Sequence, residues 1–103
     1  MDKISGLKEI LAVDPRNSFA RYGLAMEWVN QGDTDQALGE FDQLLAADPG
    51  YTAAYFMAAQ TLANVGRRED ARQRLEAGIV SAKCANNQHA ISEMQAMLDE
   101  LSV

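Results

Sequence analysis

Residues 18–51 read SFARYGLAMEWVNQGDTDQALGEFDQLLAADPGY, and this stretch decides the fold. The spacing of its apolar residues predicts two helices, one near Asn17–Gln31 and one near Asp33–Ala47. Gly32 lies between them and suits the left-handed conformation that ends a helix, because glycine has no Cβ to clash. Pro49 cannot extend the helix before it. The stretch therefore predicts a helical hairpin joined by one tight turn.

The same pattern recurs 34 residues further along the chain, where Asp14-Pro15 is followed by Asp48-Pro49. Small residues fall on small residues and large apolar residues on large apolar residues. The matched pairs are Ala20 and Ala54, Tyr22 and Phe56, Ala25 and Ala59, Trp28 and Leu62, Gly32 and Gly66, Ala37 and Ala71, and Phe41 and Leu75. A fixed interval of this length is typical of stacked helical repeats.

This period divides the chain, which we interpret as a single domain over residues 1–103. Its parts are a half repeat or N-terminal helix at 1–15, a first repeat at 18–51, a second repeat at 52–85 and a C-terminal capping helix at 86–103. Lys83 stands where Pro49 stood one repeat earlier, so we expect the last helix of the second repeat to run on. No run of alternating, β-branched residues predicts a strand, and the fold class is therefore all-α with about six helices.

The composition is that of a folded acidic protein with a formal net charge of -6. This charge argues against binding to nucleic acid or to an anionic membrane surface. Cys84 is the only cysteine, so an internal disulfide is impossible and a reducing compartment fits. The N-terminus shows no signal-peptide pattern, and no apolar run approaches the roughly 20 residues of a membrane span. We expect a cytoplasmic protein.

Catalytic and metal-binding patterns are missing from the sequence. His89 and Cys84 are too isolated for a metal site, which needs three or four ligands. The sequence has neither a glycine-rich phosphate loop nor a nucleophile elbow. We therefore expect no enzyme activity, no metal and no cofactor.

The repeated residues resemble the tetratricopeptide repeat (TPR) family, whose unit is a 34-residue helical hairpin. The matching residues are Leu24, Ala25, Trp28, Gly32, Ala37, Phe41 and Pro49 in the first repeat, and Ala59, Leu62, Gly66, Ala71 and Leu75 in the second. Arg21 and Tyr55 depart from the pattern, because they hold the place of an early tryptophan. The resemblance implies a right-handed superhelical stack of antiparallel helix pairs. It also implies a protein–protein interaction module that binds a protein or peptide segment in a concave, largely apolar groove.

The resemblance also implies which residues line that groove. They are Phe19, Tyr22, Met26, Val29 and Asn30 in the first repeat, Ala53, Phe56, Gln60, Ala63 and Asn64 in the second, and Ala90, Met94 and Met97 in the terminal helix. Methionine and aromatic side chains suit a binding surface. The same residues would also fit a core, or a face that a second copy covers. A grip on a C-terminal carboxylate is not expected, because Tyr22 and Met26 offer no cation.

The alternative function is that of a self-associating structural unit, a homodimer through its terminal helices. Ile4, Leu7 and Leu11 form an apolar face that a second copy could cover. The charged residues of the second helix in each repeat are interpreted as solvated outer faces, with attraction between copies as the sharper reading. These are Asp33, Asp35, Glu40 and Asp42 in the first repeat and Arg67, Arg68, Arg72 and Arg74 in the second.

Overall fold

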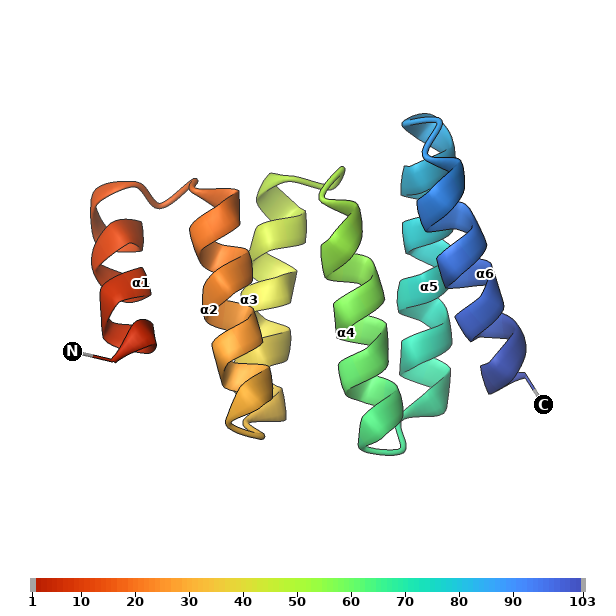
Figure 1. Cartoon of the computed structure of the whole chain (residues 1–103), viewed down its shortest axis with the longest axis horizontal. Helices are drawn as coiled ribbons and strands as arrows, with labels where there is room; N and C mark the ends of the chain where they lie inside the picture. The colour runs from red at the N-terminus through yellow and green to blue at the C-terminus, as the bar shows by residue number, and fades with distance from the viewer. Residues whose placement is uncertain (1, 103) are drawn as a thin grey trace. The chain divides into compact units, whose positions relative to one another are not determined.

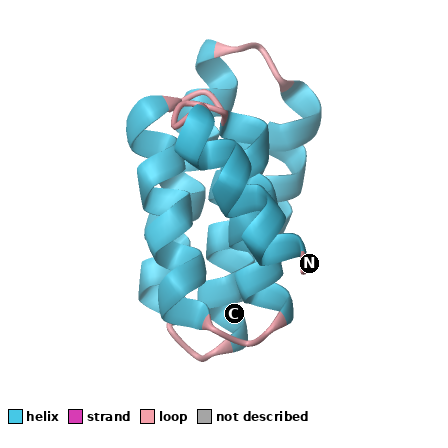
Figure 2. Ribbon diagram, turned by 90° about the vertical axis from the view of Figure 1, so that its left-hand side faces the viewer, coloured by secondary structure: helices cyan, strands magenta, loops and turns pink. Residues whose placement is uncertain are grey.

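The computed structural model describes residues 2–102, and over this range it contains six helices and no strand (Figures 1 and 2). The helices are α1 (Lys3–Val13), α2 (Ser18–Asn30), α3 (Thr34–Ala47), α4 (Thr52–Asn64), α5 (Arg68–Cys84) and α6 (Gln88–Leu101). The all-α prediction is confirmed, and each helix begins and ends within about two residues of its expected place. The chain divides between Asp48 and Pro49 into unit 1, with α1–α3, and unit 2, with α4–α6. The single domain remains a prediction.

Short polar side chains begin four of the helices. In each, the side-chain oxygen of the residue before the helix accepts a hydrogen bond from the backbone N–H three residues on, which satisfies one exposed amide. The pairs are Asp2 with Ser5, Asn17 with Ala20, Asp33 with Gln36, and Asn87 with Ala90. The bond from Ser5 also holds the pKa of the Asp2 carboxyl below its usual value.

Three left-handed residues close the hairpins between α2 and α3, α4 and α5, and α5 and α6. Gly32 has φ 77°, Gly66 has φ 83° and Asn86 has φ 56°. The residue after each one donates its N–H to a carbonyl five positions back, as in a Schellman turn, for example Asp33 to Trp28 at 2.9 Å. Asparagine is the non-glycine residue that best tolerates this conformation. The sequence interval and the backbone geometry therefore agree at the turns.

In unit 1, α1 packs on one face of α2. Leu11 is buried with Ala20 and Leu24, and Ile4 and Leu7 pack against them. The expectation that the apolar face of α1 is available to a second copy is therefore wrong, because α2 already covers it.

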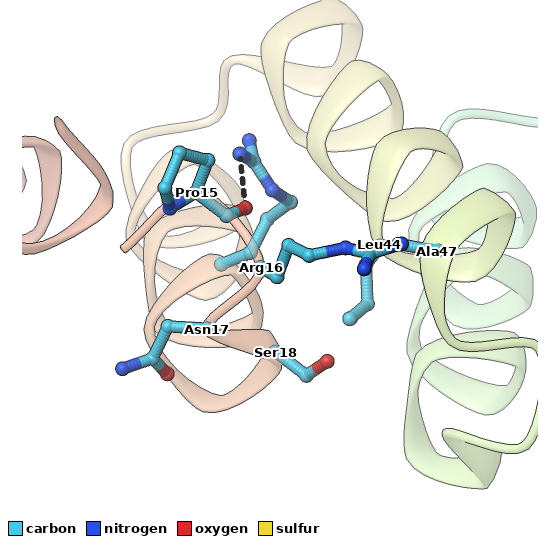
Figure 3. A pocket seen from close by; sticks show the side chains of 7 residues that line it. Pro15, Arg16, Asn17, Ser18, Leu44 and Ala47 are labelled. Atoms are coloured by element: carbon cyan, nitrogen blue, oxygen red, sulfur yellow. Dashed lines mark hydrogen bonds between the residues drawn. The ribbon is translucent and has the colours of Figure 1, made fainter. Parts of the chain in front are cut away.

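A nearly buried ion pair joins α2 to α3. The Arg21 guanidinium donates to the Glu40 carboxylate at 2.7 Å, and the two side chains are 16% and 15% exposed. Arg21 also donates to the carbonyl oxygen of Pro15 at 3.3 Å, along the dashed line that ends on that oxygen in Figure 3. The expectation that Glu40 lies on a solvated outer face is therefore wrong. In unit 2 the equivalent residue, Tyr55, donates its hydroxyl to the equivalent carbonyl, that of Pro49, at 2.8 Å.

Removing the charge of Glu40 tests the worth of this pair. Glu40→Gln should lower the free energy of unfolding by about 1–2 kcal/mol, because Arg21 keeps its charge in a mostly dry place. Glu9→Gln removes the same charge from an exposed site on α1 and should change stability by less than about 0.5 kcal/mol. Urea denaturation of both variants measures the difference, and equal values would show that the pair contributes nothing.

In unit 2, α5 packs against both α4 and α6. It runs to Cys84, as the missing proline predicted, and is 17 residues long against 14 for α3. Alanines at the helix seams are fully buried in both units: Ala25 and Ala37 in unit 1, and Ala59 and Ala71 in unit 2. Without long side chains at these positions, neighbouring helices can approach closely. Phe41, Leu44, Leu62, Leu75 and Met94 are the largest fully buried side chains.

Candidate partner-binding surface

The candidate site of unit 1 is a row of side chains along α2, here named the α2 stripe: Phe19, Tyr22, Met26 and Val29. Their spacing of three, four and three places them on one side of the helix. The side of α2 that carries Ala20 and Leu24 is covered by α1. Phe19 is 81% exposed, whereas the other three are half-buried. The stripe thus presents one projecting aromatic ring beside a partly covered apolar row.

Packing against α3 orients the middle of the stripe. The rings of Tyr22 and Phe41 have centroids 6.3 Å apart and are tilted by 57°. Phe41 is fully buried, so Tyr22 is held against a fixed partner. Tyr22 therefore belongs partly to the core and partly to the surface, and both readings of the sequence hold for it. Asn30 ends α2 and is exposed.

The corresponding residues on α4 form a smaller and more polar surface in unit 2. Phe56 and Ala63 are half-buried, and Gln60 and Asn64 are exposed. Ala53, which corresponds to Phe19, is exposed but offers only a methyl group. The most prominent apolar contact of the α2 stripe has no counterpart on α4.

Met94 does not lie at a surface. Its side chain is 1% exposed, and its sulfur lies 2.5 Å from the place that a Cβ on Gly78 would occupy. Met94 thus fills the space that the missing side chain of Gly78 leaves between α5 and α6. Ala90 is also buried, and only Met97 of the three expected residues on α6 is half-buried. The expectation that Met94 lines a groove is corrected: it is a core residue.

Two carboxylates lie at the C-terminal end of α2, where a hollow of about 470 Å³ is lined by residues 31–35. Asp33 caps α3, and Asp35 in its first turn is exposed. Within residues 2–102 neither carboxylate has an ion-pair partner. In the equivalent turn of unit 2, Arg67 pairs with Asp70 at 2.8 Å and Arg68 donates to the carbonyl oxygen of Leu101. The free charge at these two turns is therefore different.

Other exposed apolar side chains lie outside the expected site. Val13 is 88% exposed and Ile10 is 46% exposed on α1, and Val65 and Val80 are exposed in unit 2. Each is isolated in a polar stretch of sequence, so periodicity gave no sign of it. Among residues 2–102, no three His, Cys, Asp or Glu side chains gather as a metal site requires. None of the helices in this range has the length and apolar character needed to span a membrane.

Helical hairpins at a 34-residue interval, each closed by a left-handed turn, define a helical-repeat protein. The sequence pattern described as tetratricopeptide repeat matches residues 29–98. The chain belongs to the tetratricopeptide repeat family. Over 98 residues it is 29% identical to the TPR repeat-containing protein PA0015 of Pseudomonas aeruginosa, and the match covers 95% of this chain and 93% of that protein.

Solved structures share the fold. The solution structure of protein BPP2914 from Bordetella parapertussis matches with a TM-score of 0.84 at 28% identity, over 99% of this chain and 89% of that one. The TPR2B domain of yeast Sti1, solved in a complex with pHsp70, matches with a TM-score of 0.87 at 17% identity, over 96% of this chain and 79% of that one. The fold is thus that of a protein-interaction module.

Proposed function

We propose that this protein binds a segment of another protein through the α2 stripe. The observation that carries the proposal is Phe19, a phenylalanine that is 81% exposed next to three further apolar residues of the same row. An exposed aromatic ring with partly buried neighbours is typical of a binding anchor. The structure of the yeast Sti1 domain with pHsp70 supports the proposal, since that domain has the same fold and holds a partner.

The α4 residues Phe56, Gln60, Ala63 and Asn64 offer a second surface of the same origin in the proposed function. Their amides suit hydrogen bonds to the backbone of a bound segment. We expect them to contribute less binding energy than the α2 stripe, because only Phe56 is a large apolar group.

Truncation of Phe19 tests the proposal. Phe19→Ala should weaken partner binding at least tenfold, because a central aromatic anchor is worth about 2 kcal/mol or more. The immobilised chain is incubated with an extract of its own source cells, and bound proteins are quantified by mass spectrometry against Phe19→Ala. A protein retained by the unmodified chain and lost with Phe19→Ala is the expected result.

Val80→Ala is the matched control, because Val80 is also exposed and apolar but lies on α5 in unit 2. It should retain the partner. Equal retention by all three proteins would contradict the α2 stripe as the binding surface. Equal thermal unfolding of the Phe19→Ala and unmodified chains excludes unfolding as the cause of any loss.

Self-association is the second candidate function, and the exposed Ile10 and Val13 favour it. These residues lie on α1 away from the face that packs on α2. Sedimentation velocity at micromolar concentration separates the two functions. A monomer at every concentration would remove self-association, whereas a dimer disrupted by Val13→Asp would support it.

A further inference from the structure

We propose that the segment bound on the α2 stripe carries basic side chains, which lie at the C-terminal end of α2 near Asp33 and Asp35. The inference rests on the proposed function and specifies the chemistry of the partner. The stripe supplies apolar contact for any segment, and the charges around it select among segments.

Unit 1 has an excess of acidic groups that its own cations do not neutralise. Residues 2–48 contain nine Asp and Glu side chains and four Lys and Arg side chains. Three of these four cations are engaged within the unit. Lys3 pairs with Glu27 at 3.6 Å, Arg21 pairs with Glu40, and the Lys8 ammonium lies 5.5 Å from the centre of the Trp28 ring. The surface of unit 1 therefore favours a cationic partner.

The turn after α2 concentrates this charge beside the stripe. Asp33 and Asp35 line the hollow of about 470 Å³, and neither has a cation within the described chain. The C-terminal end of α2 adds the negative end of its helix dipole, and its last turn contains no basic residue. A lysine or arginine of the partner would find two carboxylates and a helix C-terminus at one place.

The length of α2 sets the spacing between anchor and charge. From Phe19 to Asn30 the helix rises roughly 16 Å at about 1.5 Å per residue. An extended segment covers that length in about five residues. The bound segment should therefore have an aromatic or branched aliphatic residue and, about five residues away, one or more lysines or arginines. Each exposed ion pair should improve binding by about two- to fivefold.

A phage-displayed library of random 12-residue peptides, selected on the immobilised full chain, tests the inference while the natural partner is unidentified. In the selected pool, Lys and Arg should be enriched at least threefold over the input, at about five positions from an aromatic or aliphatic residue. Asp33→Asn combined with Asp35→Asn should return the basic enrichment to the input level. Asparagine keeps the cap of α3, so this variant should fold normally.

Two further variants separate this inference from the proposed function. Asp99→Asn with Glu100→Gln removes the same two charges from α6 in unit 2 and should keep the basic enrichment. Phe19→Ala should reduce recovery of the whole pool. An apolar pool without basic enrichment, lost with Phe19→Ala, would overturn the inference and leave the proposed function standing. Basic enrichment that survives the Asp33 and Asp35 changes would also overturn it, and no pool above bare matrix would overturn both.

Discussion

Replacing Phe41 with alanine should lower the free energy of unfolding by about 3–5 kcal/mol. Phe41 is 0% exposed at the centre of unit 1, so truncation removes a full aromatic transfer energy and leaves a cavity. Tyr22 also loses the ring that orients it, at 6.3 Å between centroids. This loss is a large fraction of the 5–15 kcal/mol that is typical of a domain. Urea denaturation followed by the fluorescence of Trp28, the single tryptophan, reports it within the same unit.

Phe19→Ala is the control for this prediction, because it makes the same chemical change on the surface. Phe19 is 81% exposed, and its truncation should change stability by less than about 0.5 kcal/mol. The two phenylalanines should thus separate stability from binding: Phe41→Ala unfolds the chain more readily, and Phe19→Ala affects the partner. A loss above about 2 kcal/mol for Phe19→Ala would show that its ring is part of the core.

The fold could be predicted from the sequence because its signals are local. Gly32 and Gly66 mark left-handed turns that few other residues tolerate, and Pro49 marks a helix end. A repeat then multiplies each weak signal, since the same position is read twice. The four seam alanines, at 25, 37, 59 and 71, were identified in this way, and all are fully buried.

The residues that were misplaced depend on contacts between distant parts of the chain. Arg21 and Glu40 are 19 positions apart on different helices, and a charged helical residue is more often solvated than paired. Met94 lies on an apolar face of α6, but the period of that face does not say that α5 covers it. The partner of Met94 is the empty place at Gly78, and an absent side chain leaves no apolar signal. The exposure of Phe19 likewise depends on which neighbours cover α2.

Gly78→Ala should destabilise the protein by about 2 kcal/mol, although alanine is the better helix former by about 1 kcal/mol. A Cβ at this position would lie 2.5 Å from the sulfur of Met94 and 2.6 Å from the Cβ of Tyr55. The end of Met94 is flexible, but it is 1% exposed and has no open space to enter. The Cβ of Tyr55 is fixed by the backbone of α4, so α4 and α5 must move apart. Such overpacking costs about 1–3 kcal/mol.

Gly39→Ala should have the opposite sign, which makes the pair a sharp test. Gly39 is a helical glycine of α3, it is exposed, and a Cβ there would meet nothing within 4 Å. Its replacement should therefore raise the free energy of unfolding by about 0.5–1 kcal/mol through helix propensity alone. Circular dichroism during urea denaturation compares the two variants. If both stabilise the protein, α4, α5 and α6 approach less closely at Gly78 than the structure indicates. If Gly78→Ala destabilises and the further change Met94→Ala restores part of the loss, the two residues share one space, because independent sites would add.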